Sequence, residues 1–215
     1  TAATQPFPVG DPFVTQTLDI PPEGFDLTNQ GKIFTPFWDE PILLKRGEAN
    51  WPPSTVDPAK GYMYVCAGER QAAYSTQTDT DLASSGDRYT GGSMRFAPVP
   101  TTGVVAAVNL LDNKVVWSQR WSSRCYSGLV ASAGGLVFAG RNDGRFTAID
   151  SENGRKLWEF MTDAGVNAPP ATFQHEGEQY VAVLSAGNLI AGSKRGDSVW
   201  LFGLESSGIE SAIEI

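Results

Sequence analysis

Two short segments of this 215-residue chain share the pattern Asn-x-Pro-Pro-x-Thr: NWPPSTVD at residues 50–57 and NAPPATFQ at residues 167–174. The side-chain amide of Asn50 or Asn167 can cap a turn, or it can donate a hydrogen bond to an oxygen of a bound molecule. The prolines that follow fix φ and stiffen the chain beyond each asparagine. The spacing alone favours a turn cap, and the repetition indicates a chain built from related units.

Few other residues are suited to chemistry. His175 is the only histidine, which excludes a histidine-based metal site, and the chain has no Cys-x-x-Cys-His motif for covalent haem attachment. Asp79, Asp81 and Asp87 lie in a polar stretch but lack the glycine and glutamate of an EF-hand. These carboxylates are therefore expected to be solvated loop charges.

The two cysteines stand in strand-like contexts, Cys66 in YMYVCAG and Cys125 in SSRCYSG. Small, buried thiols are the interpretation that this context favours. A disulfide between the two cysteines stays open, because sequence alone does not decide pairing.

The composition limits the possible partners. A net charge of −8 disfavours binding to a phosphate backbone, so nucleic acid is not expected as a partner. No apolar run approaches the ~20 residues that a membrane helix requires. The 41% hydrophobic content is typical of a folded globular protein, and the 23 glycines and 14 prolines indicate many turns between short strands.

A second repeat shows how these strands are organised. The pattern small-x-(Asp/Asn)-x-x-x-(Gly/Asn)-x-x-x-Trp occurs at residues 107–117 and again at residues 148–158. An Asp or Asn after a strand accepts backbone N–H bonds in a turn, and Gly or Asn four residues later tolerates positive φ. The tryptophan provides a large apolar face and an indole N–H that needs a carbonyl partner. A chemically consistent match at every slot indicates a structural repeat.

These repeats predict an all-β protein, part of a β-propeller whose blades are four-stranded antiparallel sheets. We expect one blade at residues 50–121, with a polar insertion at 69–103 that should be a loop. A second blade is expected at 122–162, and a last blade, lacking its outer strand, at 163–215. Residues 1–49 are expected to form a connecting segment or strands of a preceding blade, with KIFTPFW and PILLK as strand candidates.

The segments NWPPSTVDPAKGYMYVCAG, SAGGLVFAGRNDGRFTAIDSENGRKLWEF and EGEQYVAVLSAG resemble the C-terminal blades of quinoprotein alcohol dehydrogenases. These enzymes are periplasmic eight-bladed propellers that use pyrroloquinoline quinone (PQQ) and a calcium ion. The Ala-x-Asp-x-x-x-Gly-x-x-x-Trp stretch resembles the tryptophan-docking motif of that family. The segments TQPFPVGDPFV and IFTPFW are similar to the connecting segment of the polyvinyl-alcohol-dehydrogenase-like branch.

The resemblance implies a cofactor site. It implies that Asn50 donates a hydrogen bond to a PQQ carbonyl oxygen and that Trp51 contacts the ring region. A fixed neutral donor suits this position, because the donor does not have to reorganise when it stabilises the charge that develops on the quinone oxygen. Val166 and Asn167, in GVNAPP, are implied as further cofactor-binding residues.

The resemblance also implies what the chain lacks. The family's catalytic Asp, its calcium-binding Glu and Asn, and its adjacent cysteine pair come from earlier blades and match no position here. No catalytic residue or metal ligand is therefore assigned, and the chain alone is expected not to oxidise an alcohol. It starts at Thr1 without an initiator Met or a signal peptide, which indicates processing or a part of a longer protein.

The function implied is the C-terminal portion of a PQQ-dependent alcohol dehydrogenase, in which hydride transfer from an alcohol to PQQ is assisted by Ca²⁺. Implied partners are the remaining propeller blades or a companion chain, and cytochrome c as electron acceptor, in the periplasm. The alternative is a non-catalytic PQQ-repeat propeller that serves as a protein-binding scaffold. The NWPP segment and the long insertion favour the dehydrogenase, because a scaffold needs no axial asparagine.

Overall fold

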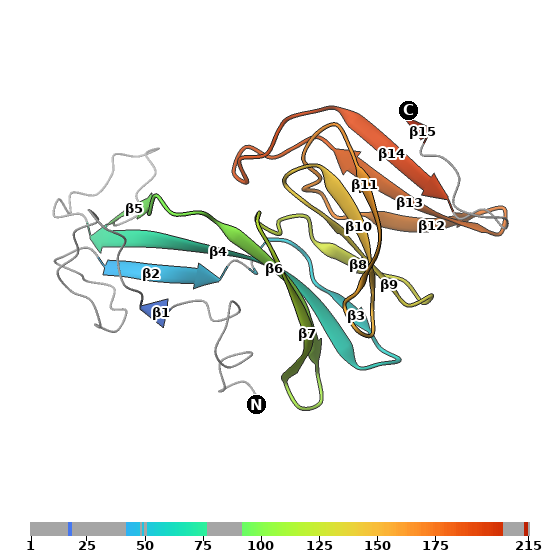
Figure 1. The fold of residues 1–215 in the computed structure, drawn as a ribbon, viewed down its shortest axis with the longest axis horizontal. Coiled ribbons are helices and arrows are strands. Elements are labelled where there is room, and N and C mark those ends of the chain that lie inside the picture. The colour runs from blue at the N-terminus through green and yellow to red at the C-terminus, as the bar shows by residue number, and fades with distance from the viewer. Residues whose placement is uncertain are drawn as a thin grey trace, which may run out of the picture.

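The computed structural model describes residues 49, 51–76 and 92–203, together with the backbone of short strands at 17–18, 42–47 and 213–214. The described part consists of strands and turns, arranged in three antiparallel sheets that follow one another along the chain (Figure 1). The predicted all-β architecture of stacked, antiparallel β-propeller sheets is confirmed.

The central sheet is a complete four-stranded blade. Its spatial order is β11-β10-β9-β8, so each strand pairs with its neighbour in the chain. Its strands are β8 (Leu129–Ala131), β9 (Leu136–Gly140), β10 (Arg145–Asp150) and β11 (Lys156–Met161).

The third sheet has the order β12-β13-β14-β15. Its strands are β12 (Ala171–His175), β13 (Glu178–Ser185), β14 (Ser198–Gly203) and β15 (Ile213–Glu214). The sequence predicted no outer strand here, whereas two residues near the C-terminus occupy that position and pair with Trp200 and Leu201. The prediction missed β15 because a two-residue strand carries no periodic pattern.

The first sheet is larger than one blade. Its blade part pairs β3 (Thr55–Asp57), β4 (Tyr62–Thr76), β6 (Thr102–Asn109) and β7 (Lys114–Trp121). The far half of β4 continues past the blade and pairs with β2 (Ile42–Gly47) and β5 (Gly92–Phe96), while β1 (Thr17–Leu18) pairs with β2. These strands form an arm that projects to the left in Figure 1.

The arm corrects two predictions. Residues 69–76 and 92–96 are strands, although the insertion at 69–103 was expected to be a loop. Its Ser-, Thr- and Gly-rich composition concealed these strands, since pairing partners override a weak strand propensity. PILLK contributes to β2, which pairs with β4 rather than with a preceding blade, and KIFTPFW lies outside the described residues.

The repeated tryptophan motif behaves as its slots predict. Trp117 lies opposite Ala107 across the β6–β7 ladder, and Trp158 lies opposite Ala148 across the β10–β11 ladder. In each motif the Asp or Asn side chain accepts a backbone N–H two residues on. Positive φ angles at Asn113 (57°) and Gly154 (76°) complete the turns.

Trp117 joins the first sheet to the second. Its indole Nε1 donates to the carbonyl of Ser151 at 3.0 Å, and its ring packs so closely on Gly154 that an added Cβ would lie 2.6 Å from Cδ2. Tyr64 donates to the same carbonyl at 3.1 Å, and the Gln119 amide donates to the carbonyl of Gly154. The turn after β10 therefore forms the binding surface for the Trp117 and Tyr64 side chains of the preceding sheet.

An aromatic cluster joins the second sheet to the third. Phe146 is fully buried, and its ring centroid lies 5.7 Å from Phe138, 6.1 Å from Trp158 and 5.4 Å from Phe202. Phe202 belongs to β14, so the cluster crosses the interface. Burial of large rings in offset and edge-on contacts supplies the main apolar stabilisation here.

Asp163 adds a polar link at the same interface. Its carboxylate accepts hydrogen bonds from Ser198 Oγ and Ser185 Oγ, both at 2.9 Å, and these bonds lower the pKa of Asp163 below its ordinary value of 3.8. Because the pKa of this carboxyl is lower in the folded state, ionised Asp163 stabilises the fold at pH values above the unfolded-state pKa. This contribution is lost as the pH falls through the folded-state pKa.

We therefore expect Asp163→Asn to lose less stability than the wild type when the pH is lowered from 6 to 3. Urea unfolding at both pH values measures this difference. Asp112→Asn, in the exposed β6–β7 turn, is the matched control. An equal acid-dependent loss in wild type and Asp163→Asn would contradict the role of this carboxylate.

Candidate functional site

Three segments that lead into the inner strands, and two that follow β9 and β13, meet at one end of the sheets, here called the junction end. They are residues 51–54 before β3, 124–128 before β8, 140–142 after β9, 165–167 before β12, and the loop 186–197 between β13 and β14. Backbone hydrogen bonds join them in series: Leu129 N to Pro53 O, Val166 N to Arg141 O, and Gly165 N to Lys194 O.

Close backbone packing shapes the junction end. Gly128 has φ +79° and faces the ring of Pro53, where an added Cβ would lie 2.5 Å from Pro53 Cδ. Gly140 faces Val166 so closely that a Cβ would overlap the valine side chain. Glycine is required at both positions because another segment occupies the space that a side chain would take.

A chain of side-chain amides and a hydroxyl connects the second and third sheets at this end. Asn167 Nδ2 donates to Asn142 Oδ1 at 2.7 Å, and Ser193 Oγ donates to Asn167 Oδ1 at 2.5 Å. Asn142 Nδ2 donates to the carbonyl of Ala191 at 2.9 Å. Asn188 Oδ1 accepts the backbone N–H groups of Ile190 and Ala191. This network anchors the loop 186–197 to Asn142 and Asn167, in two other segments of the junction end.

The four residues predicted to bind a cofactor have different surroundings. Asn50 lies outside the described residues. Trp51 is 79% exposed, whereas Val166 is fully buried and packs in the core between the second and third sheets. Asn167 is partly buried; the hydrogen bonds among described residues use one of its two N–H groups, so the other can donate to a ligand.

Sequence reasoning missed three contributors to this end, Arg124, Asn142 and Ser193. Arg124 is buried, lies 4.8 Å from the Tyr126 ring centroid, and donates to the carbonyl of Ile190 at 3.2 Å. Asn142 stands between β9 and β10, in a segment to which the sequence analysis assigned no role. The relevant signal, an asparagine in a turn, is common, and nothing local indicates that its partners lie on another sheet.

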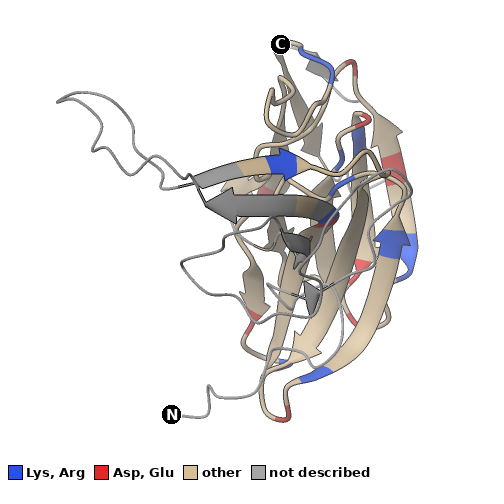
Figure 2. Cartoon of the chain, turned by 90° about the vertical axis from the view of Figure 1, so that its left-hand side faces the viewer, with Lys and Arg blue, Asp and Glu red and all other residues tan. Residues whose placement is uncertain are grey.

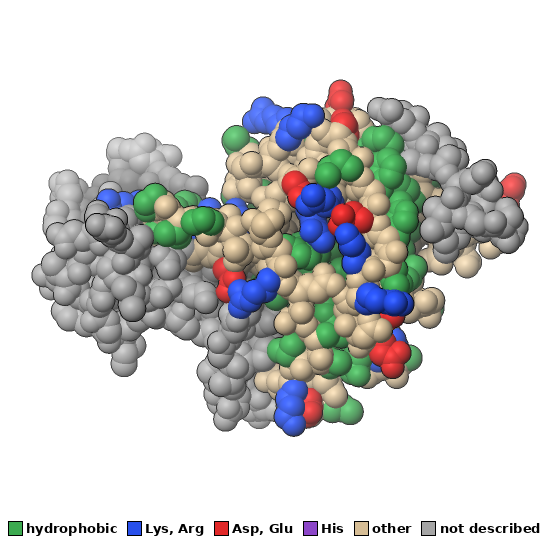
Figure 3. All heavy atoms as spheres, in the orientation of Figure 1, with side chains coloured by type: hydrophobic (Ala, Val, Ile, Leu, Met, Phe, Trp, Pro, Cys, Tyr) green, Lys and Arg blue, Asp and Glu red, His purple; other side chains and the backbone are tan. Residues whose placement is uncertain are grey.

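Arg141 at the junction end is paired with an acidic side chain. The Arg141 guanidinium lies 4.0 Å from the Trp121 ring centroid and 3.5 Å from Glu159, between the first and second sheets. Burial lowers the pKa of Arg141 below its ordinary value, an effect that the nearby Glu159 opposes. Basic and acidic side chains are interspersed over the described surface (Figure 2), and Figure 3 shows the same mixture on its front face.

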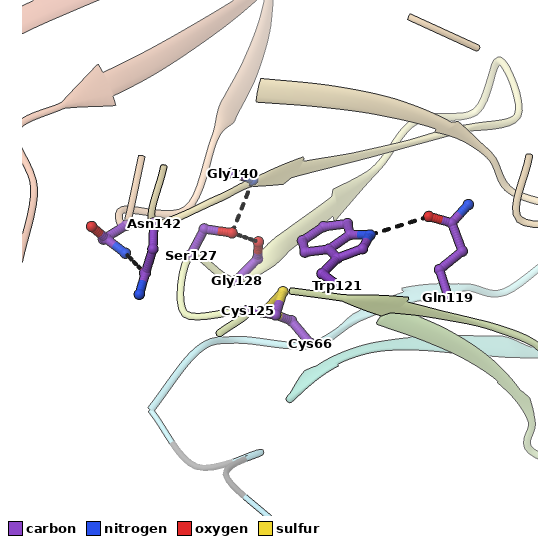
Figure 4. The surroundings of a disulfide bond; sticks show 9 residues. Cys66, Gln119, Trp121, Cys125, Ser127, Gly128, Gly140 and Asn142 are labelled. Carbon is purple, nitrogen blue, oxygen red and sulfur yellow. Dashed lines mark hydrogen bonds between the residues drawn. A yellow bond between two sulfur atoms is a disulfide. The ribbon is translucent and has the colours of Figure 1, made fainter. Parts of the chain in front are cut away.

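Cys66 and Cys125 form a disulfide with their Cα atoms 5.4 Å apart, and both residues are buried (Figure 4). The favoured prediction of two buried thiols is therefore wrong. The cysteines are 59 residues apart in sequence, and they meet because the segment after β7 folds back over β4 on its way to the second sheet. Trp121 lies beside the bond in Figure 4.

A cluster of metal-binding side chains is absent from the part of the chain that the structure describes. Residues 49, 51–76 and 92–203 contain no cluster of three or more His, Cys, Asp or Glu side chains suited to a metal ion. The same residues include no helix able to cross a lipid bilayer.

The stacked antiparallel sheets, with Trp117 of the first sheet docked on the turn of the second, define a segment of a β-propeller. Within that class, residues 99–181 match the β-propeller domain model of glucose, ethanol and alcohol dehydrogenases that use PQQ. The predicted resemblance to quinoprotein alcohol dehydrogenases is thereby confirmed. The polyvinyl-alcohol-dehydrogenase-like branch stays a prediction.

Individual relatives agree with this assignment. The chain is 31% identical over 174 residues to the quinoprotein ethanol dehydrogenase of Pseudomonas aeruginosa, a match that covers 74% of this chain and 28% of the relative. It is 29% identical to the lanthanide-dependent methanol dehydrogenase of Methylorubrum extorquens, covering 82% of this chain and 28% of that protein.

A solved structure shows the same fold. The quinohemoprotein alcohol dehydrogenase from Comamonas testosteroni superposes with a TM-score of 0.63 at 24% identity, over 80% of this chain and 29% of that one. The chain thus spans less than a third of the length of each of these proteins.

Proposed function

We propose that this chain supplies cofactor-side blades of a PQQ-dependent alcohol dehydrogenase. The observation that carries the proposal is the match of residues 99–181 to the PQQ β-propeller domain. When bound, PQQ accepts a hydride from the carbon of the alcohol. This chain's own part is to hold and orient the cofactor, while the catalytic base belongs to residues outside it.

The donor set at the junction end fits a quinone. Trp51 presents an exposed indole, suited to contact with a flat ring, and Asn167 has a neutral N–H available. Asn50, directly before Trp51, would donate to a quinone oxygen. Val166 would support the site through packing against Gly140, because its side chain has no exposed surface. These four residues form the proposed cofactor-binding set.

The metal would be held elsewhere. The described residues contain no suitable ligand cluster, so carboxylate and amide ligands would come from other blades. Calcium is the ion that the sequence resemblance implies. The relative from Methylorubrum extorquens is named as lanthanide-dependent, so a trivalent ion is the alternative that an experiment should include.

The outer face of the third sheet supports a further blade as partner. Val181 and Val183 point into the interface with the second sheet, so by the alternation of strands Tyr180 and Leu184 point the other way. Phe173, Leu184 and Val199 are 44%, 42% and 40% exposed. Hydrophobic side chains line the side of the molecule that carries β13 and β14 in Figure 3. A blade from the same protein or from a companion chain would cover them.

The remaining partners follow from the proposed reaction. An alcohol is the substrate, and a separate cytochrome c would receive the electrons. The disulfide supports the periplasm as location, because such bonds persist in oxidising compartments.

Reconstitution of the full-length natural protein tests the function. The protein is loaded with PQQ and either Ca²⁺ or a lanthanide, and alcohol-dependent dye reduction is measured. We expect activity with one of the two ions, and no dye reduction with either would refute the dehydrogenase.

The same preparation tests the proposed role of Asn50. Asn50→Ala should weaken PQQ binding about tenfold, which corresponds to one hydrogen bond. Asn109→Ala, at the end of β6 on the opposite side of the first sheet, is the control and should bind PQQ normally. Unchanged affinity in Asn50→Ala would remove that residue from the site.

A further inference from the structure

Residues 122–128, here called the connector, lead from β7 to β8 without belonging to a strand. The connector is nevertheless fixed at its centre, because Cys125 is fully buried and covalently joined to Cys66 in the blade half of β4. It also packs flush on β6, since a Cβ on Gly103 would lie 2.5 Å from Cys125 N. A segment without ladder hydrogen bonds is thus attached to the rigid part of the first sheet.

The connector touches three of the segments that build the junction end. Arg124 Nη1 donates to the carbonyl of Ile190 in the loop 186–197. Ser127 Oγ accepts the N–H of Gly140 at 3.0 Å, a contact drawn in Figure 4. Gly128 packs against Pro53, two residues after Trp51. Each contact is made by a different residue within three positions of Cys125.

We propose that the Cys66–Cys125 disulfide positions the junction end for cofactor binding. The bond holds the connector on β4, and the connector in turn holds Pro53, Gly140 and the loop that carries Ile190. Both cysteines act through other residues, since their buried side chains present no surface to a ligand. This inference rests on the proposed function and deepens it, because it names what keeps the PQQ-facing segments in register.

The physical reason lies in preorganisation. Without the bond, the connector would retain only its hydrogen bonds and packing, and local opening would become more frequent than opening of the sheets. A ligand that needs the ordered arrangement would then spend part of its binding free energy on restoring it. Affinity would fall although no group in contact with the ligand had changed.

The test uses the full-length natural protein with Cys66→Ala/Cys125→Ala, at a temperature where the variant is folded. Amide hydrogen exchange is followed at Leu129, Gly140 and Ala191, whose N–H groups are hydrogen-bonded in the structure. PQQ affinity is measured by titration. We expect about tenfold faster exchange at these amides and about tenfold weaker PQQ binding.

Ile149→Ala is the matched control, because Ile149 is fully buried in the same core but lies at the end of β10 away from Gly140. Ile149→Ala should destabilise the protein without a selective increase in hydrogen exchange at the three amides. Ser127→Ala keeps the disulfide and removes one connector contact; it should raise exchange at Gly140 and serves as the second variant if the double variant does not fold.

The outcomes are distinct. Exchange that rises equally in the double variant and in Ile149→Ala would reduce the disulfide to a general stabiliser and overturn the proposal. A selective increase in exchange at the three amides of the double variant, with unchanged PQQ affinity, would also overturn the proposal. Failure of the wild type to bind PQQ, together with selective exchange, would overturn the proposed function and support the positioning role of the disulfide.

Discussion

Gly154→Ala is expected to lower the free energy of unfolding by about 3 kcal/mol. Gly154 has φ +76°, which costs an L-residue roughly 1–2 kcal/mol. The added Cβ would lie 2.6 Å from the indole of Trp117, and overpacking of this kind costs about 1–3 kcal/mol. Chemical denaturation followed by circular dichroism measures the sum.

Gly61→Ala separates the two causes. Gly61 has a similar φ of +67°, but an added Cβ would meet nothing within 4 Å. This control should cost only the backbone strain, roughly 1–2 kcal/mol. In a Trp117→Ala background, Gly154→Ala should also cost only the strain, because the overlapping ring is absent. Equal costs for Gly154→Ala in both backgrounds would show that the tryptophan does not dock on this turn.

Phe146→Ala is expected to cost about 3–5 kcal/mol, the usual range for loss of a buried aromatic side chain. Phe146 is fully buried and contacts rings from both the second and the third sheet, so its removal leaves a cavity at their interface. Denaturation monitored by tryptophan fluorescence is informative because Trp158 is one of its neighbours.

Phe173→Ala provides the comparison for this change. Phe173 is 44% exposed and stacks on Tyr180 at 5.6 Å. In the described structure its truncation should cost about 1 kcal/mol or less. If the two phenylalanine variants were equally stable, the aromatic cluster would not be the element that holds the second and third sheets together.

The repeated motif could be understood from sequence because its chemistry is local. The Asp150 carboxylate needs only a backbone N–H donor two residues on, and Gly154 needs only its own backbone conformation. The interval between Ala148 and Trp158 follows from a hairpin of known length. A repeat of these features at residues 107–117 then predicts a second blade of the same kind.

The candidate site was predictable only in part. The repeated Asn-x-Pro-Pro pattern located segments that lead into inner strands, and the structure places both at the junction end. It did not distinguish exposed Trp51 from buried Val166. Burial depends on which segment lies opposite, and Val166 is covered by Gly140 of another sheet.

The sequence by itself determined the strands of the repeated hairpins, their turn chemistry and their cross-strand Ala–Trp pairs, since each depends on residues within one hairpin or on a repeat of it. Only the tertiary structure decided the Cys66–Cys125 bond, the extension of β4 into an arm, and the Asn142–Asn167–Ser193 network. These features depend on the choice of partner between distant segments. That choice is settled by the packing of whole sheets, which a local pattern of residues does not specify.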